Sequence, residues 1–353
     1  MRGRGSRTSS LALGRRSALR APAAPGFGPA AKRQPTADRF AARASERAGT
    51  RGTFSVNQEP ASFVVCGGGE AKWHRLQTRS PGPLALPIAT CARIFGSRAY
   101  REIFAGIRAY CMFLGYPRSG HSLVGSLLDA HPHAIIAHEL HALRYVRYGF
   151  SRDQLFWLLL ENSRDFSRQG RVWTGYSYLV PGQWQGRFSD LRVIGDKRGG
   201  TSVRELRRRP WLLEELRARV ALPLKFIHVV RNPYDNIATM HVKNSKGRPL
   251  EVAFDHYLGM AHGVLELKQK LPEDDMVDLR HEDLVADPQT RLQALCHFLG
   301  LEPETDYLNA CASIVFRSPH RTRKDVQWSP ELLARAEREF SALPFLSGYS
   351  FDA

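Results

Sequence analysis

The stretch that decides the fold is CMFLGYPRSGHSLVGSLLDAHP, residues 111–132. The apolar run within residues 110–116 predicts a buried strand. After it, a helical face is formed by Leu123, Val124, Leu127 and Leu128. Between strand and helix lies a loop framed by Gly115 and Gly120, which we call the glycine loop (residues 115–122). Backbone N–H groups at the start of such a helix attract an anion. The stretch therefore predicts a strand–loop–helix unit that binds an anion.

The rest of the chain repeats this alternation of strands and helices. Further strands are predicted at residues 134–137, 191–197, 225–230 and 275–280. Helices are predicted at residues 139–149, 152–166, 211–220, 233–242, 251–271 and 287–301. Strands that alternate with helices indicate an α/β fold, a parallel β-sheet flanked by helices on both faces. Ligands bind such sheets beyond the carboxyl ends of the strands.

The composition divides the chain into two parts. Residues 1–110 hold 17 Arg and 2 Lys against 5 acidic residues, whereas the remainder is nearly neutral. The first 60 residues are rich in Arg, Ala, Ser, Gly and Pro and lack apolar periodicity, which is typical of disordered chain. We therefore expect a disordered or targeting extension over residues 1–100 and one domain over residues 105–353. An organelle transit peptide and a non-functional extension both fit the extension.

Several classes of protein are disfavoured by the same composition. Because the excess basic charge lies in the extension, we expect no nucleic-acid partner for the domain. No apolar run reaches the roughly 20 residues of a transmembrane helix. Five scattered cysteines without a Cys-x-x-Cys pair predict neither a disulfide framework nor a metal site. A cytoplasmic location is expected, with organelle targeting through the Arg/Ser/Ala-rich N-terminus as the alternative.

The glycine loop differs from the nucleotide-binding G-x-x-x-x-G-K-[ST] pattern at one decisive position. Gly115, Gly120 and Ser122 fit the pattern, but His121 stands where the pattern has lysine. An NTPase needs that lysine on the β- and γ-phosphates, so its absence argues against ATP hydrolysis. The cation of this loop is Arg118 instead, and arginine suits an oxyanion cluster that is bound and not transferred.

Four motifs resemble those of the PAPS-dependent sulfotransferases, whose fold is similar to that of P-loop NTPases. The glycine loop resembles the 5′-phosphosulfate loop, particularly in the Pro-Arg-Ser-Gly branch that includes the tyrosylprotein sulfotransferases. FIHVVRNPYDNIATM (residues 226–240) resembles the 3′-phosphate-binding strand and helix. LRHEDLVADP (residues 279–288) and RTRKDVQWSPELL (residues 321–333) resemble two later family segments, the second of which closes over the nucleotide.

The resemblance implies which residues bind the co-substrate PAPS and its product PAP. In the glycine loop they are Arg118, Ser119, Gly120, His121 and Ser122. Arg231 and Thr239 look like the 3′-phosphate pair, and the eight-residue spacing lets a helix bring the hydroxyl back toward the guanidinium. In the C-terminal basic segment the candidates are Arg323 and Lys324, together with Arg321. A charge run of this kind is usually a solvated face.

The resemblance also implies a catalytic set of Arg118, Lys197 and Glu139, without a metal. Lys197 ends a strand, where a solvated lysine is the alternative. Glu139 follows Arg118 by 21 residues, the interval of the catalytic glutamate in the tyrosylprotein branch. As base it competes with two neighbouring histidines, His138 and His141, because histidine titrates near neutrality. Glu139 is equally explained as a carboxylate at a helix N-terminus.

These features together predict a sulfotransferase enzyme. It moves the sulfuryl group of PAPS in line to an acceptor hydroxyl, on a carbohydrate, a small molecule or a peptide. The alternatives are a P-loop nucleotide kinase or NTPase, which needs the missing lysine, and a non-catalytic PAP-binding protein. A homodimer is left open as the assembly state.

Overall fold

The computed structural model describes residues 100–244, 247–318 and 320–352. The expected extension over residues 1–100 lies outside the described residues, apart from Tyr100. A short helix, α4 (Arg101–Ala105), precedes the expected domain start at residue 105, and its Phe104 is buried in the core. Within the described part of the chain, no helix has the length and apolar composition needed to cross a bilayer.

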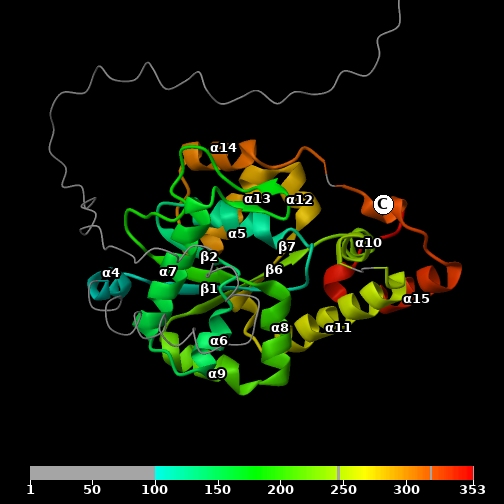
Figure 1. Ribbon diagram of the computed structural model, residues 1–353, viewed down its shortest axis with the longest axis horizontal. Coiled ribbons are helices and arrows are strands. Elements are labelled where there is room, and N and C mark those ends of the chain that lie inside the picture. The colour runs from blue at the N-terminus through cyan, green and yellow to red at the C-terminus, as the bar shows by residue number, and fades with distance from the viewer. Residues whose placement is uncertain (1–99, 245–246, 319, 353) are drawn as a thin grey trace, which may run out of the picture. The chain divides into compact units, whose positions relative to one another are not determined.

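The centre of the fold is a five-stranded parallel sheet (Figure 1). Its strands are β1 (Ala109–Leu114), β2 (Ala134–His138), β5 (Val193–Lys197), β6 (Leu224–Val230) and β7 (Met276–Arg280). They stand in the order β2-β5-β1-β6-β7, and every neighbouring pair is parallel. All residues of β1, β2 and β5 are buried, as expected for strands covered on both faces. The predicted α/β class is confirmed.

Helices cover both faces of the sheet and build two cores. One core receives side chains from α5 (His121–Asp129), α12 (His281–Ala286), α13 (Pro288–Phe298) and α14 (Thr305–Ser313). The other receives them from α6 (Ala142–Arg147), α7 (Arg152–Arg168), α8 (Gly199–Arg208), α9 (Trp211–Val220), α10 (Pro233–Asn244), α11 (Leu250–Lys268) and α15 (Pro330–Ser341). In Figure 1, α5, α12, α13 and α14 lie above the strands, and α6, α8, α9 and α11 lie below them.

The helix predicted over residues 139–149 starts later than expected. Observed helix α6 begins at Ala142, because His141 takes the left-handed conformation with φ 68°. Glu139 is also left-handed, with φ 61°, and its N–H bonds the carbonyl of Lys197 3.2 Å away. Glu139 thus continues the ladder between β2 and β5 by one bond, so it stands at the carboxyl edge of the sheet and not in a helix.

A two-stranded hairpin, β3 (Val172–Trp173) and β4 (Tyr176–Ser177), was not predicted. The residue before it, Arg171, is 1% exposed and pairs with the fully buried Asp129 of α5 at 2.7 Å. Asp129 also accepts hydrogen bonds from the Ser163 hydroxyl and the Ile136 N–H. Removing one partner of such a pair leaves a buried charge uncompensated. The pair therefore fixes the base of the hairpin to the core.

Candidate active site

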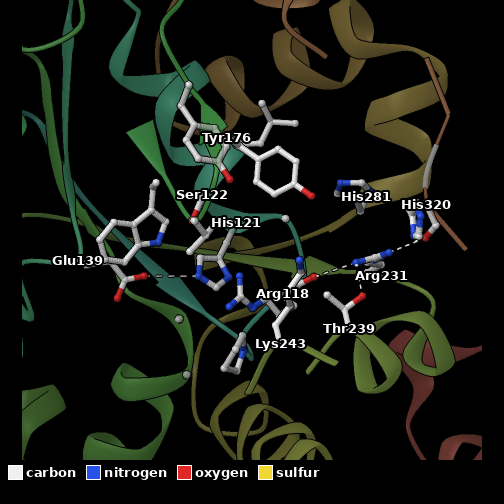
Figure 2. Close-up of a pocket in the computed structure, with 18 of the residues that line it drawn as sticks. Arg118, His121, Ser122, Glu139, Tyr176, Arg231, Thr239, Lys243, His281 and His320 are labelled. Carbon is white, nitrogen blue, oxygen red and sulfur yellow. Dashed lines mark hydrogen bonds and ion pairs between the residues drawn. The ribbon is translucent and has the colours of Figure 1, made fainter. Parts of the chain in front are cut away.

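A cavity of about 840 Å³ opens at the carboxyl edge of the sheet, with the glycine loop on one side (Figure 2). The hairpin, the start of α8, parts of α10, α11 and α12, and the chain after α14 also line it. Among the residues that line it are Arg118, Gly120, His121, Ser122, Glu139, Arg198, Arg231, Thr239 and His281. This is the edge at which the sequence analysis expected a ligand.

The glycine loop presents its helix start to this cavity. Gly115 (φ 136°) and Gly120 (φ 98°) adopt conformations that favour glycine, and Arg118 lies in the left-handed region at φ 70°. Asn236 donates to the Pro117 carbonyl at 2.8 Å, so α10 holds the loop from behind. Gly120 caps α5 without a side-chain hydrogen bond. The first N–H groups of α5 therefore lack intrahelical partners and form an anion seat.

Glycine at position 120 is also required by close packing. A Cβ there would lie 2.2 Å from Cδ2 of His281. His281 begins α12 directly after β7, lines the cavity and has a buried Nδ1 without a hydrogen-bond partner among the described residues. Burial and the neighbouring Arg231 lower the pKa of His281 to about 4. The sequence analysis missed this residue, although its place after a strand pointed to the site.

Lys197 and Glu139, which are 58 positions apart, meet in the site. Lys197 Nζ lies 2.8 Å from Glu139 Oε1 and donates to Ser122 Oγ at 2.9 Å. The lysine is 1% exposed. Burial lowers its pKa, and the Glu139 carboxylate opposes that shift. For Glu139, burial alone would raise the pKa, but Lys197, His121 and Arg198 hold it well below its ordinary value. The structure thus contains Glu139 as a carboxylate tied to a buried ammonium group.

Arg198 fixes Glu139 from the other side. Its Nη1 donates to the Glu139 carbonyl at 2.9 Å and lies 3.2 Å from Oε2. These contacts hold the glutamate in its left-handed conformation, which is uncommon for a non-glycine residue and occurs often at functional sites. Arg198 was missed from the sequence, although it directly follows Lys197 at the end of a strand.

His121, the departure from the lysine pattern, links the loop to Glu139. Its Nδ1 lies 3.0 Å from Ser119 Oγ, and its Nε2 lies 3.8 Å from Glu139 Oε1 (Figure 2). Burial, with Lys197 and Arg118 nearby, lowers the pKa of His121 although Glu139 opposes the shift. The imidazole is therefore neutral near pH 7. Ser119 is buried and does not line the cavity. The hydrogen bond of its hydroxyl is with His121.

The two histidines that competed with Glu139 do not face the cavity. His138 is 7% exposed and stacks on Phe166 with ring centroids 4.0 Å apart, with Trp173 on its edge. His141 is the left-handed residue before α6. Neither lines the cavity, whereas Glu139 and His121 do. The backbone explains this, since β2 ends at His138 and both Glu139 and His141 then take left-handed conformations, so that the three side chains leave the chain in different directions.

Burial of His138 has a measurable consequence for acid stability. Burial and the charge of Lys197 lower its pKa to about 2, so the folded protein keeps it neutral while the unfolded chain binds a proton below about pH 6.5. Stability from this group is present above pH 6.5 and is lost as pH falls. In His138→Phe, we expect the free energy of unfolding to depend less steeply on pH between 6 and 4, by about 1.4 kcal/mol per pH unit. Urea unfolding at a series of pH values measures this, and an unchanged slope in His138→Phe would contradict the expectation.

Arg231 and Thr239 come together as the sequence predicted. Arg231 Nη1 lies 3.3 Å from both Thr239 Oγ1 and the Arg118 carbonyl, and Nη2 donates to the His320 carbonyl at 2.6 Å (Figure 2). All of these acceptors are neutral oxygens. Across the described residues, no carboxylate is within ion-pair distance of Arg231, and its buried Nε has no partner. Because β1 and β6 are neighbours, this cation lies beside the glycine loop.

The C-terminal basic segment is arranged differently from the prediction. Arg323 is 1% exposed and pairs with Asp235 of α10 at 2.9 Å, and it does not line the cavity. Lys324 is exposed and also lies outside the lining. Arg321 does line the cavity. Nucleotide binding by Arg323 therefore stays a prediction without support from its position, because its guanidinium pairs with buried Asp235 and fixes the segment against α10.

The cavity is cationic on one part of its wall and aromatic on another. Its lining contains Arg118, Arg198, Arg204, Arg231, Lys243 and Arg321, and among the described lining residues Glu139 is the one carboxylate. The hairpin adds Trp173, Tyr176 and Tyr178. Tyr176 touches Phe316 with ring centroids 6.0 Å apart. Over the described ranges, no group of three or more His, Cys, Asp or Glu side chains is arranged to hold a metal ion.

Comparison with known proteins supports the resemblance at the level of the family. Residues 221–306 match the sequence profile described as Sulfotransferase family. The match contains β6, Arg231, Thr239 and the segment that starts α12, but not the glycine loop. Over these residues the resemblance to the sulfotransferase family is confirmed, whereas the tyrosylprotein branch is not. A search of curated proteins finds no match to this sequence.

Solved sulfotransferase structures share the general arrangement at low similarity. The sulfotransferase domain of the olefin synthase of Synechococcus PCC 7002 is 22% identical, with 65% of this chain and 83% of that chain covered and a TM-score of 0.39. A sulfotransferase from Mycobacterium tuberculosis is 14% identical, with 78% and 86% covered and a TM-score of 0.43. A mouse sulfotransferase complexed with PAP is 13% identical, with 70% and 90% covered and a TM-score of 0.38. At these scores the overall likeness adds nothing to the argument from the residues.

Proposed function

We propose that this sulfotransferase-family chain transfers a sulfuryl group from PAPS to an acceptor hydroxyl, in line, with a carboxylate base and without a metal. The observation that carries the proposal is a pair of anion sites at neighbouring strand ends. The glycine loop follows β1, and Arg231 ends β6 beside it. A nucleotide with both a 5′- and a 3′-phosphate would occupy the two sites together.

The residues present fit that nucleotide. Arg231 is held by neutral oxygens and keeps a buried Nε without a partner among the described residues, so its charge is available for a phosphate. The planar guanidinium of an arginine so placed can bind two oxygens of a phosphate by paired hydrogen bonds. The first N–H groups of α5, with Arg118 and the Ser122 hydroxyl, suit the second phosphate. We propose Ser119, Gly120 and His121 as further parts of that seat; Lys324 stays a prediction without support from its position.

The co-substrate supplies an activated sulfuryl group on its 5′-phosphate, and the protein supplies charge and position. Transfer between oxygens builds negative charge on the leaving phosphate, which preorganised cations stabilise. Arg118 lies in the glycine loop and lines the cavity, and Lys197 contacts two further lining residues, Ser122 and Glu139. We assign these two residues to that task.

Glu139 is the proposed base. It lines the cavity, whereas His138 and His141 do not. Burial raises the pKa of Glu139, but Lys197 and Arg198 outweigh burial and hold this pKa well below its ordinary value. The side chain is therefore ionised and able to accept the proton of an acceptor hydroxyl, at some loss of intrinsic basicity. This loss of basicity is offset because the acceptor oxygen releases its proton only while its bond to sulfur forms.

The acceptor class remains as broad as the sequence predicts, a hydroxyl on a carbohydrate, a small molecule or a peptide. Aromatic residues of the hairpin, Trp173, Tyr176 and Tyr178, line the cavity, and loops of this kind carry specificity on many scaffolds. A cytoplasmic location, the organelle-targeted alternative and a homodimer likewise stay predictions.

Calorimetry with PAP, AMP and ATP tests the proposal. In buffer with a chelator, PAP is expected to bind at least about 30-fold more tightly than AMP, because only PAP has the 3′-phosphate that Arg231 binds. ATP should bind weakly with or without Mg²⁺. Equal affinity for AMP and PAP, or tight Mg²⁺-dependent ATP binding, would favour the kinase or NTPase alternative. Tight PAP binding without PAP formation from PAPS across a panel of phenols and sugars would favour a non-catalytic PAP-binding protein.

A further inference from the structure

A glycine stands in the interior of α5 at a position where the helix itself gains nothing from it. Gly125 is the fifth residue of this nine-residue helix and is fully helical. Glycine in a helix interior is destabilising relative to alanine. Its neighbours Val124, Ser126 and Leu127 are buried, so the position faces protein and not solvent. A packing reason is therefore needed.

That reason is the side chain of Lys197. A Cβ at position 125 would lie 2.6 Å from Lys197 Cγ and 2.9 Å from its Cβ, both shorter than any real contact of this kind. Ile136 Cγ2 would be 3.7 Å away. The lysine starts at the end of β5 and passes over Gly125 with 1% of its side chain exposed. It does not line the cavity itself, but its Nζ contacts Ser122 and Glu139, which do. The stem of the lysine thus occupies the space that any other residue at position 125 would fill.

The preceding turn of the same helix contacts the ammonium group of Lys197. Ser122 precedes Gly125 by three residues and therefore lies on the same face of α5. Its Oγ accepts from Lys197 Nζ at 2.9 Å, while Glu139 Oε1 lies 2.8 Å from the same nitrogen. One helix face therefore sets both ends of the lysine, the stem at position 125 and the charge at position 122.

We propose that Gly125 is a positioning residue for sulfuryl transfer, which places the Lys197 ammonium group between Ser122 and Glu139. The proposal rests on the function proposed above for Lys197. Because the stem is buried and lies against Gly125, a methyl group at position 125 displaces the stem and with it Nζ. A shift of this kind loosens the ion pair to Glu139 and moves a charge that must be in place before the reaction begins. Arg231 and Thr239, which bind the other phosphate, are untouched.

Gly125→Ala tests the proposal, with Gly259→Ala as the matched control. Gly259 also lies inside a helix, α11, but a Cβ there would meet nothing within 4 Å, and it does not line the cavity. The control should keep turnover and gain slightly in thermal midpoint. Gly125→Ala should lose at least about tenfold in PAP formation from PAPS, because small displacements of catalytic charges are costly. Its PAP dissociation constant, measured by calorimetry, should change by less than about threefold, since Arg231 and the loop N–H groups remain.

A double-mutant cycle with Lys197→Gly identifies the cause. Glycine has neither the Cβ nor the Cγ that a Cβ at position 125 would meet, so in this background Gly125→Ala should lose most of its cost in thermal midpoint and should not lower turnover further. If Gly125→Ala alone fails to fold, the double variant should fold. Equal thermal cost in both backgrounds would overturn the proposal, as would wild-type turnover in Gly125→Ala.

The failure of this proposal is distinguishable from that of the proposed function. If the wild-type protein binds no PAP, the sulfotransferase assignment fails, yet the coupling of positions 125 and 197 in thermal midpoint is still measurable. If PAP binds and PAPS is turned over but Lys197→Ala is fully active, the sulfotransferase assignment is retained. In that case the positioning role of Gly125 is overturned.

Discussion

Glu139→Gln is expected to lose about 10²–10⁴-fold in turnover while PAP affinity stays within about twofold of wild type. A neutral hydroxyl is a poor nucleophile until a base removes its proton, and an amide of the same shape cannot take that proton. Lys197 and Arg198 would lose a charged partner, but both face Glu139 and not the Arg231 site. Initial rates of PAP formation from PAPS, beside calorimetry of PAP, separate the two effects.

Three histidine variants serve as controls for this experiment. His138→Asn and His141→Asn should each fall less far than Glu139→Gln, because neither side chain lines the cavity. His121→Asn is the most stringent of the three controls, because His121 lies 3.8 Å from the Glu139 carboxylate and also lines the cavity. If Glu139→Gln keeps more than about a tenth of wild-type turnover while a histidine variant is inactive, the base is that histidine.

Arg231→Ala is expected to weaken PAP binding by about 2–5 kcal/mol, which is roughly 30- to 5,000-fold. The guanidinium is buried at 8% exposure and bound by neutral oxygens, so a phosphate that loses it is left desolvated without its cation. AMP lacks the 3′-phosphate, so its affinity should hardly change. Calorimetry of both nucleotides measures the difference.

A matched control for Arg231 is Arg207→Ala. Arg207 pairs with Glu266 on an exposed surface at 2.9 Å and does not line the cavity. Its loss should leave PAP binding as in wild type. An equal loss of AMP and PAP affinity in Arg231→Ala would show that Arg231 supports the loop through the Arg118 carbonyl and does not bind the 3′-phosphate.

Local sequence patterns predicted those parts of the fold whose signal lies within one short segment. The apolar runs at β1 and β6 are long and buried, and each is followed by a turn and a helix start, so the sheet and its active edge followed from periodicity alone. Arg231 and Thr239 met as expected because a strand end and the second turn of the next helix have a fixed relation. The hairpin at residues 172–177 was missed, because its two-residue strands give no periodic signal and its base depends on a buried pair with Asp129.

The orientation of neighbouring side chains was decided by tertiary structure. His138, Glu139 and His141 are chemically plausible bases in one short stretch, and only Glu139 reaches the cavity, because β2 ends there and two residues turn left-handed. Arg323 and Lys324 stood beside Arg321 as equals in the sequence, yet Asp235 draws Arg323 into the core.

The sequence by itself determined the α/β class, and it predicted a glycine loop at one strand end and a second cation at the neighbouring strand end, since both follow from local backbone geometry. Only the tertiary structure decided which charges meet. Lys197 and Glu139 are far apart along the chain, and a bare Cα at Gly125 lets the lysine pass to the glutamate. Contacts of this kind depend on packing between elements, where a difference of one methyl group decides the outcome and local propensity carries no information about it.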